Sequence, residues 1–336
     1  MSALREENKE VMELASELGN IVNMYDVNNY PKFLTSMADK KLSKQITVHS
    51  KKTLGEGGFG SVYLGCCKNK AAKMDVAVKI FSKHCYDTFI ESIAVESHLL
   101  TKWRHENILH SLGLYKKKSE WCLALEYMSK GNLRQLILDP QHKISQEQIA
   151  YISYSVCNAV EFIHSKNIMH RDIKPDNILI SAGNQVKLSD FGTAECTVKF
   201  QFIEEGHMLG TIPYAPPEQW AGMGYNQSVD IWAMGIVFCE LITGIHYAPF
   251  TFCNNIESTS KDQEDDSILQ IKIKSSLPLK SPLKVPTETS ALELDTLQSD
   301  LVLACLNTDP DQRPKATHLK AYFKQFTHDA SLPEKN

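Results

Sequence analysis

The sequence predicts an α+β protein with two lobes, a small β-rich lobe at about residues 46–127 and a larger, mainly helical lobe at about 128–326. Three observations support this class. Apolar and polar residues alternate through most of the first part, as they do in half-buried strands. Only one stretch of that part has the helical period. After Gly131, long stretches with the helical period dominate.

The first lobe begins with a predicted hairpin. Residues 46–67 alternate like two strands around a glycine-rich turn, and residues 75–81 and 121–128 read as two further strands. Residues 89–103 carry the helical period. The basic run at 115–120 is interpreted as a solvated turn between strands.

In the second lobe, the two longest helical patterns cover residues 144–166 and 228–244. Two polar segments interrupt this lobe, at 254–267 and 275–290, and their composition is typical of surface connections. Residues 327–336 are assigned to a C-terminal tail.

Residues 1–45 form an N-terminal extension. Residues 4–24 read as an amphipathic helix, because apolar side chains recur at helical spacing with Glu and Lys between them. Two interpretations of the apolar stripe stay open, packing on the domain that follows or docking on a partner, and we favour the first. Residues 25–45 are interpreted as a connector.

Bulk composition excludes some classes of function. The chain has 336 residues, of which 43% are hydrophobic and 23% charged, as in ordinary globular proteins. Its net charge of −4 argues against a nucleic-acid partner held by a bulk positive field. Nine scattered cysteines favour a reducing compartment, no apolar run is long enough to span a membrane, and the N-terminus is too charged for a secretory signal. We expect a cytoplasmic location, with the nucleus left open, and neither membrane nor nucleic-acid partners.

The glycine-rich turn is the first motif that carries chemistry. Gly55, Gly57 and Gly60 form G-x-G-x-x-G, followed by Val62. A dinucleotide-binding turn has the same spelling, but it leads from a strand into a helix. Here the glycines lie between two predicted strands. A hairpin turn with so little side chain can lay its backbone N–H groups over phosphates.

A lysine follows in an apolar strand. Lys79 lies mid-strand in "VAVK", where a charge needs a partner if the strand is buried. The next predicted helix offers Glu96 or Glu91. The alternative is an exposed lysine on an edge strand.

The stretch "MHRDIKPDNILI" at 169–180 concentrates polar residues between apolar flanks. It contains Asp172 and Asn177, and Asp190 follows in "LSDFG". Carboxylate and amide oxygens suit Mg²⁺, which also takes phosphate oxygens and water. Asp190 and Asn177 are the candidate metal ligands. Asp172 can then accept a proton from an attacking hydroxyl or orient it.

Together these motifs resemble the eukaryotic protein kinase superfamily. The matches are "GEGGFGSV", "VAVK", "HRDIKPDN", "DFG" and "PPE", in this order, over about residues 46–326. "SVDIWAMG" resembles the family helix that anchors the catalytic loop through Asp230, and "DPDQRP" supplies Arg313 as a partner for Glu218. The resemblance implies the bilobal protein kinase fold. It does not assign a subfamily.

By this resemblance, Asp172 is the catalytic base and Lys174 steadies the transferring γ-phosphoryl group. Lys79 holds the α- and β-phosphates and is oriented by Glu96. His170 packs beneath the catalytic loop.

The resemblance also implies ATP and Mg²⁺ as cofactors, with Asn177 and Asp190 as metal ligands. It places ATP-binding residues in the glycine turn, on the next strand, at the hinge between the lobes and under the adenine. They are Leu54, Gly55, Glu56, Gly57, Gly58, Phe59, Gly60, Ser61, Val62, Ala77, Lys79, Glu126, Met128 and Leu179.

Two residues go with Ser/Thr specificity in the family, Lys174 shortly after the catalytic Asp and Thr211 in "GTIPYAPPE". We therefore expect protein substrates with Ser or Thr acceptors. The preferred substrate sequence stays open. Asn132 stands where basic-directed members often carry an acid, while Asp176 and Glu240 are further sources of negative charge.

The sequence departs from the family pattern at a few positions. Pro216 replaces the Ala of the A-P-E motif, and Ser111 stands where a large apolar residue often links the lobes, with Leu112 as the alternative. No catalytic group is lost. This disfavours a pseudokinase that acts only as a binding module, and the full segment ending in "PPE" disfavours a small-molecule kinase.

Regulation is predicted around Arg171, which precedes the catalytic Asp. In the family such an Arg usually meets a phosphate on the activation segment, here residues 190–218. No Ser, Thr or Tyr lies between Phe200 and Leu209. The hypothesis is that Glu204 or Glu205 substitutes for that phosphate; the alternative is that both acids are solvated.

Overall fold

The computed structural model describes residues 29–58, 60–68, 72–83, 86–141, 143–196, 210–244 and 296–327. Several predictions lie outside these ranges. They are the amphipathic helix at 4–24, the polar connections at 254–267 and 275–290, nearly all of the tail, Phe59, Glu204 and Glu205.

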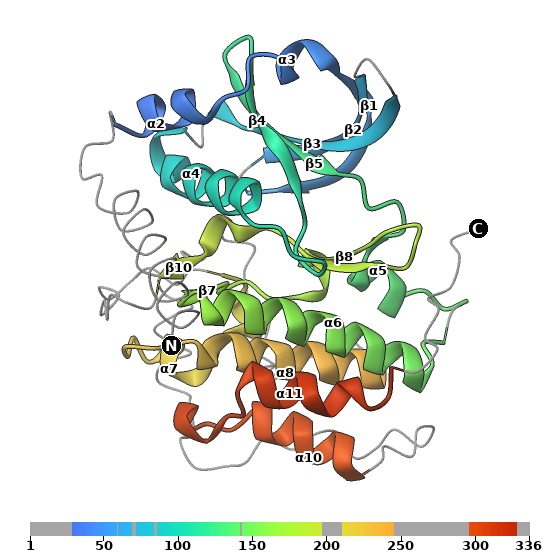
Figure 1. The fold of residues 1–336 in the computed structure, drawn as a ribbon. Helices are drawn as coiled ribbons and strands as arrows, with labels where there is room; N and C mark the ends of the chain where they lie inside the picture. Colours follow the sequence, from blue (N-terminus) through green and yellow to red (C-terminus); the bar gives the residue numbers. More distant parts are fainter. Residues whose placement is uncertain are drawn as a thin grey trace, which may run out of the picture.

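The first lobe is built on an antiparallel sheet in the order β1-β2-β3-β5-β4 (Figure 1). Its strands are β1 (Ile46–Gly57), β2 (Gly60–Lys68), β3 (Lys73–Phe81), β4 (Ser111–Lys117) and β5 (Glu120–Glu126). The helix α4 (Tyr86–Lys102) lies beside the sheet. The predicted strands and the predicted helix at 89–103 are confirmed, and the basic run ends in a turn where Lys118 has a φ of 55°.

Alternation along β3 decides which side chains meet α4. Val76 and Val78 belong to an apolar cluster that includes Leu42 and Tyr115. Side chains of successive strand residues point to opposite faces. Ala77 and Phe81 accordingly belong to the other cluster, which includes the buried side of α4. Lys79 shares the parity of Ala77 and Phe81, so the period of two directs its amine toward α4.

The segment expected to be a connector contains two helices, α2 (Asn29–Met37) and α3 (Leu42–Gln45). Tyr30 and Leu34 of α2 are buried in the main core, and Phe33 lies 6.1 Å from the ring of His98 on α4. Burial on α4 explains why these residues do not form an open linker, because apolar surface removed from water favours the helix.

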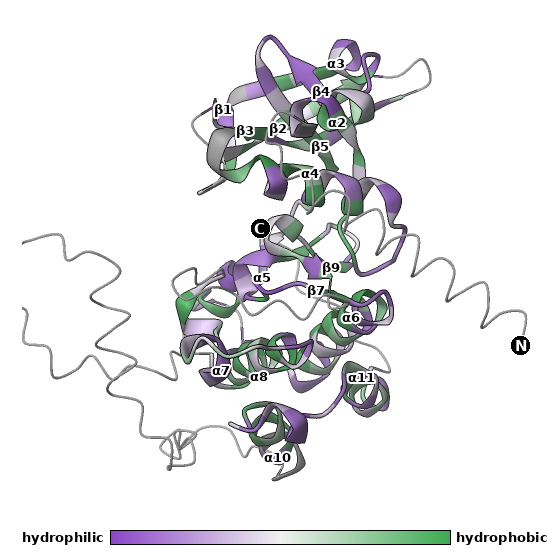
Figure 2. Ribbon diagram, turned by 90° about the vertical axis from the view of Figure 1, so that its left-hand side faces the viewer, coloured by the Kyte–Doolittle hydropathy of each residue, from purple (hydrophilic) through white to green (hydrophobic). Residues whose placement is uncertain are grey.

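The second lobe is helical, as predicted. Its helices are α5 (Leu133–Ile137), α6 (Gln146–Ser165), α7 (Pro217–Trp220), α8 (Ser228–Thr243), α10 (Thr296–Cys305) and α11 (Ala316–Lys324). Ser145 and Gln148 form a capping box that begins α6. Almost every residue of α8 is buried, which fits its mainly hydrophobic colouring (Figure 2). Helix α8 is therefore the central support of this lobe.

Short strands hold the functional loops above α6 and α8. They are β6 (Gly131–Asn132), β7 (Ile168–Met169), β8 (Ile178–Ile180), β9 (Val186–Leu188) and β10 (Glu195–Cys196). Strand β6 pairs with β8 and β8 with β9, while β7 pairs with β10. The segments before and after each motif are thus fixed to one another. Within the described ranges, no helix has the length and apolar character needed to cross a membrane.

The structure decides between Ser111 and Leu112 for the position that often links the two lobes. Ser111 is buried, donates to the carbonyl of Ala124 and accepts from the hydroxyl of Thr101 on α4. A bulge lies between Ser111 and Gly113, and Leu112 packs with the cluster around Tyr115 instead. The alternative that Leu112 shifts into the position between the lobes is wrong, because the bulge turns its side chain away.

Candidate active site

Lys79 joins an acid from each lobe. Its amine lies 2.8 Å from both carboxylate oxygens of Glu96 on α4 and 2.9 Å from Oδ1 of Asp190. Burial alone would lower the pKa of Lys79, but Asp190 and Glu96 together raise it, so the amine stays protonated. Of the two acids predicted as partners on this helix, Glu96 makes the contact. Lys79 is buried rather than exposed on an edge strand, since β3 pairs with β2 and β5.

Asp190 follows β9 and has a left-handed backbone, with a φ of 61°. Burial would raise the pKa of its carboxyl, yet Lys79 lowers it below its ordinary value. Asp190 is therefore an ionised carboxylate that accepts a hydrogen bond from Lys79 of β3.

The catalytic loop forms a closed polar network. The hydroxyl of Thr211 donates to Oδ1 of Asp172 over 2.7 Å, and Lys174 donates to Oδ2 of Asp172 over 2.8 Å. Lys174 also donates to Thr211 over 2.5 Å. Asn177 donates to the carbonyl and to Oδ2 of Asp172, over 2.8 and 2.9 Å. The carboxylate of Asp172 is thus oriented from three sides.

Gly210 allows this network to close. Its φ is +103°, and a Cβ added there would lie 2.4 Å from the carbonyl oxygen of Arg171. A larger residue would push the segment carrying Thr211 away from Asp172. Glycine is required here by both its backbone conformation and the close approach.

Asp230 supports the loop from below. It is fully buried at the start of α8 and accepts hydrogen bonds from the backbone N–H groups of His170 and Arg171, each at 2.9 Å. Nε2 of His164 lies 2.8 Å from Oδ2 of Asp230, the oxygen that also accepts from His170. Burial would raise the pKa of Asp230, but these contacts lower it.

His170 packs beneath the loop, as expected. Its ring contacts that of Phe191 edge-on, with centroids 4.6 Å apart. Its Nδ1 accepts from the N–H of Asp172 over 3.2 Å, which leaves Nε2 to donate to the carbonyl of Ser189 over 3.0 Å. His170 therefore connects the catalytic loop to the segment that carries Asp190.

The structure gives two different reasons for glycine at the positions of this turn. Gly60 has a φ of +145°, and a Cβ there would lie 2.1 Å from the carbonyl oxygen of Ile80. The sheet itself therefore requires Gly60. By contrast, no heavy atom lies within 4 Å of the Cβ position at Gly55, Gly57 or Gly58. The open space beside these three is what a phosphate would use.

The predicted adenine residues lie in the core or pack against it. Ala77 belongs to the core cluster, and the partly buried Val62 and Leu179 pack against it. At the hinge, Met128 accepts from the N–H of Gly131. The N–H of Met128 has no partner within the described part of the chain, so it is an available donor. The carboxylate of Glu126 accepts a hydrogen bond from Lys187 over 2.7 Å.

A buried ion pair fixes the end of the activation segment. Arg313 contacts both oxygens of Glu218, at 2.6 and 2.8 Å, and stacks over Trp232 at 5.0 Å. The pair that the resemblance implied is therefore present, and Pro216 does not disturb it.

The acids discussed for substrate preference have partners. Arg134 lies 3.0 Å from Glu240 and 3.4 Å from Asp176. Glu240 is fully buried, so its charge is balanced inside the fold. The preferred substrate sequence consequently stays open.

Sequence reasoning missed the partners of Arg171. Its guanidinium donates to the carbonyl of Thr193 over 2.6 Å, to the hydroxyl of Tyr225 over 3.2 Å and to the carboxylate of Glu195. Glu195 carries no local signal in the sequence. The contact arises because β10 pairs with β7, just before the catalytic loop.

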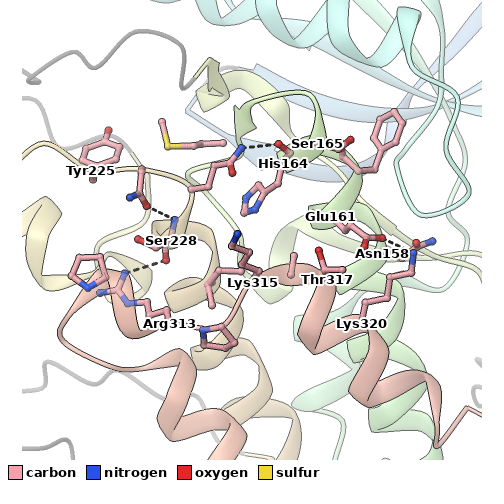
Figure 3. A pocket seen from close by; sticks show the side chains of 18 of the residues that line it. Asn158, Glu161, His164, Ser165, Tyr225, Ser228, Arg313, Lys315, Thr317 and Lys320 are labelled. Atoms are coloured by element: carbon pink, nitrogen blue, oxygen red, sulfur yellow. Dashed lines mark hydrogen bonds and ion pairs between the residues drawn. The ribbon is translucent and has the colours of Figure 1, made fainter. Parts of the chain in front are cut away.

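A cavity of about 880 Å³ lies apart from the candidate catalytic and metal-binding side chains (Figure 3). It is bordered by α6, by the loop before α8 and by the start of α11, with Glu161, His164, Tyr225 and Lys320 among its walls. None of the candidate catalytic or metal-binding side chains lines it. Across the described ranges, no three His, Cys, Asp or Glu side chains form a metal cluster, so the candidate cation site remains Asp190 with Asn177.

Comparison with known proteins agrees with this geometry. Residues 48–323 match the family model of the protein kinase domain. The chain is 32% identical over 270 residues to the serine/threonine-protein kinase TIO of Arabidopsis thaliana, covering 79% of this chain and 18% of that protein. It is 32% identical over 287 residues to the human cyclin-dependent kinase-like 2, covering 79% of this chain and 55% of that protein.

The chain thus spans about half, or less, of the length of these relatives. The family model, however, matches well over half of this chain. On this evidence, the chain belongs to the protein kinase superfamily and has its bilobal fold.

Proposed function

We propose that this chain is an ATP-dependent serine/threonine protein kinase, which transfers the γ-phosphoryl group of Mg-ATP to Ser or Thr hydroxyls of protein substrates. The observation that carries the proposal is the closed network of Asp172, Lys174 and Thr211. Phosphoryl transfer depends mainly on positioning and on charge, and this network fixes both. The Arabidopsis relative is named as a serine/threonine-protein kinase.

The donor set fits a divalent cation bound with phosphates. Asn177 uses its amide N–H group on Asp172, which leaves its amide oxygen as a hard acceptor. Asp190 is an ionised carboxylate. When bound, Mg²⁺ neutralises charge on the β- and γ-phosphates. Asn177 and Asp190 would hold it, and Lys79 would meet the α- and β-phosphates.

The protein groups have separate tasks in the transfer. Asp172 accepts the proton of the attacking hydroxyl or orients that hydroxyl. Lys174, held by Asp172 and Thr211, places a positive charge beside the group being transferred. Thr211 ties the end of the activation segment to the base, so a correctly folded segment and a correctly placed Asp172 occur together.

The rival proposal is a pseudokinase that acts by contact. It is disfavoured because Lys79, Asp172, Asn177 and Asp190 are all present, with Lys79 in contact with Asp190 and Asn177 in contact with Asp172. We further propose a cytoplasmic location, with the nucleus left open, since the cysteine pattern favours a reducing compartment.

The deciding experiment is transfer of labelled phosphate from Mg-ATP to generic protein substrates. Wild type is compared with Asp190→Asn, with Asp172→Asn and with the matched control Asp300→Asn, an exposed acid on α10. We expect a loss of at least about 100-fold for the first two variants and none for the control. Equal incorporation by wild type and Asp190→Asn would support the binding module. Label on tyrosine alone would contradict the Ser/Thr assignment.

A further inference from the structure

Arg171 adopts a backbone conformation that needs support. Its φ is 66°, in the left-handed region that residues with a side chain rarely enter, and it directly precedes Asp172. A residue in this conformation persists only when its surroundings hold it there. The placement of Asp172 therefore depends on the contacts of Arg171.

Those contacts come from four residues, and two of them, Thr193 and Glu195, belong to one segment. Asp230 on α8 accepts from its backbone N–H over 2.9 Å, and Thr193 accepts from its Nε over 2.6 Å. Tyr225 accepts from Nη1 over 3.2 Å, and Glu195 supplies the negative charge. The side chain of Arg171 is 7% exposed and that of Glu195 is 19% exposed, so the pair is largely shielded from water. A shielded pair is screened much less than a surface one.

The backbone of Glu195 is held in place independently of Arg171. It lies on β10, where it pairs with Met169 of β7, the strand that leads into the catalytic loop. Next to this pairing, the hydroxyl of Thr193 donates to the carbonyl of His170 over 3.0 Å. The carboxylate is thus carried by a strand that pairs with the residues just before the arginine it binds.

The pair is compatible with an assembled catalytic site. The same structure contains the contacts of Lys79 with Glu96 and Asp190 and those of Asp172 with Lys174 and Thr211. Binding of Arg171 by Glu195 therefore does not pull Asp172 away from Lys174 and Thr211.

A second acid adds negative charge near Arg171. Glu91 on α4 interacts electrostatically with both Arg171 and Glu195 and accepts a hydrogen bond from Tyr30 of α2. The charge of Arg171 is thus attracted by Glu91 as well as by its direct partner Glu195. A phosphate placed on the activation segment beside it would add negative charge that these acids repel.

We infer that Glu195 is a positioning residue, the anionic partner through which Arg171 holds Asp172, and that the chain needs no phosphate on its activation segment for this purpose. The inference deepens the proposed function and rests on it. It gives Glu195 the role of negative partner for Arg171. The earlier hypothesis gave this role to Glu204 or Glu205, which lie outside the described residues.

The test compares Glu195→Gln, Glu195→Asp and the matched control Glu120→Gln, made in the full chain and treated with phosphatase. We expect wild type to keep its transfer rate after phosphatase treatment. Glu195→Gln keeps the shape but loses the charge, and we expect its kcat to fall by at least about tenfold. Its KM for ATP should change by less than about threefold, because the nucleotide contacts are elsewhere. Glu195→Asp should recover most of the rate.

Hydrogen exchange of the peptide spanning 168–174 gives a readout that needs no activity. Exchange should be faster in Glu195→Gln than in wild type, and close to wild type in Glu195→Asp and Glu120→Gln. Loss of wild-type activity on phosphatase treatment would overturn the inference. So would wild-type kcat and exchange in Glu195→Gln. If wild type transfers no phosphate under any treatment, the proposed function fails, and the exchange data still decide whether Glu195 positions the loop.

Discussion

Arg313 and Glu218 are joined by two hydrogen bonds, 2.6 and 2.8 Å long, although 95 residues separate them in the chain. Their side chains are 0% and 4% exposed. The pair ties the end of the activation segment to the segment before α11, and Arg313 also donates to the carbonyl of Ser228 at the start of α8.

Removing one member of this pair leaves a buried charge without its partner. We expect Glu218→Gln to lower the free energy of unfolding by roughly 3–5 kcal/mol. Denaturation in urea, followed by circular dichroism, measures the change. Replacing both residues, as in Glu218→Gln with Arg313→Met, should cost less than the sum of the single changes. Strict additivity would contradict a direct interaction.

Helix α2 should support the position of α4. Leu34 is fully buried between them, so Leu34→Ala should lower the free energy of unfolding by about 2–5 kcal/mol. Leu303→Ala, at an exposed site on α10, is the matched control and should change it little. Because α4 carries Glu96, we also expect Leu34→Ala to reduce the transfer rate at temperatures where the protein stays folded. Unchanged stability would mean that α2 does not pack as described.

The two kinds of glycine in the turn can be separated experimentally. Gly60→Ala places a Cβ against the carbonyl of Ile80 and should lower the melting temperature. Gly57→Ala meets no protein atom, so its melting temperature should match that of wild type while its KM for ATP rises. A thermal melt and an ATP titration of both variants test this. A rise in KM for Gly60→Ala alone, with no change in melting temperature, would reverse our assignment.

Stability should depend on pH through Asp230. Its pKa is lower in the folded protein than in the unfolded chain, so the unfolded chain binds more protons in acid. The stabilisation is complete above the ordinary pKa of the carboxyl and is lost as the pH falls through the lowered value. Asp230→Asn should therefore be less stable than wild type near neutral pH, by about 3 kcal/mol, and should lose less on acidification.

Urea denaturation of both proteins between about pH 7 and pH 3 measures this dependence. Asp311→Asn, an exposed acid near α11, is the control and should follow wild type. Parallel curves for Asp230→Asn and wild type would show that Asp230 is not the group responsible.

The sequence allowed prediction of the parts whose chemistry is local. The strand that carries Lys79 and the loop that carries Asp172 follow from periodicity and from motifs that span a few residues. The glycine motif predicted a phosphate turn, but it did not reveal that Gly60 serves the sheet, since that depends on how closely β2 approaches β3.

Other features could have been predicted but were missed. Tyr30, Phe33, Leu34 and Met37 recur at helical spacing inside the supposed connector, with Pro31 in the first turn, where a helix tolerates it. The contact between Arg171 and Glu195 is different in kind. It depends on the register of two short strands, which has no signature in either stretch taken alone.

The amine of Lys79, which lies within 2.9 Å of acids from both lobes, also bears on how a nucleotide enters. An amine that is already fully bonded cannot simply gain a phosphate oxygen. Lys79 must release one of these oxygens as it takes up the phosphate, and if it releases Asp190, that carboxylate becomes available for the cation. Nucleotide binding in this chain is therefore an exchange of ionic partners, and its affinity reports the difference between two sets of contacts rather than the strength of one.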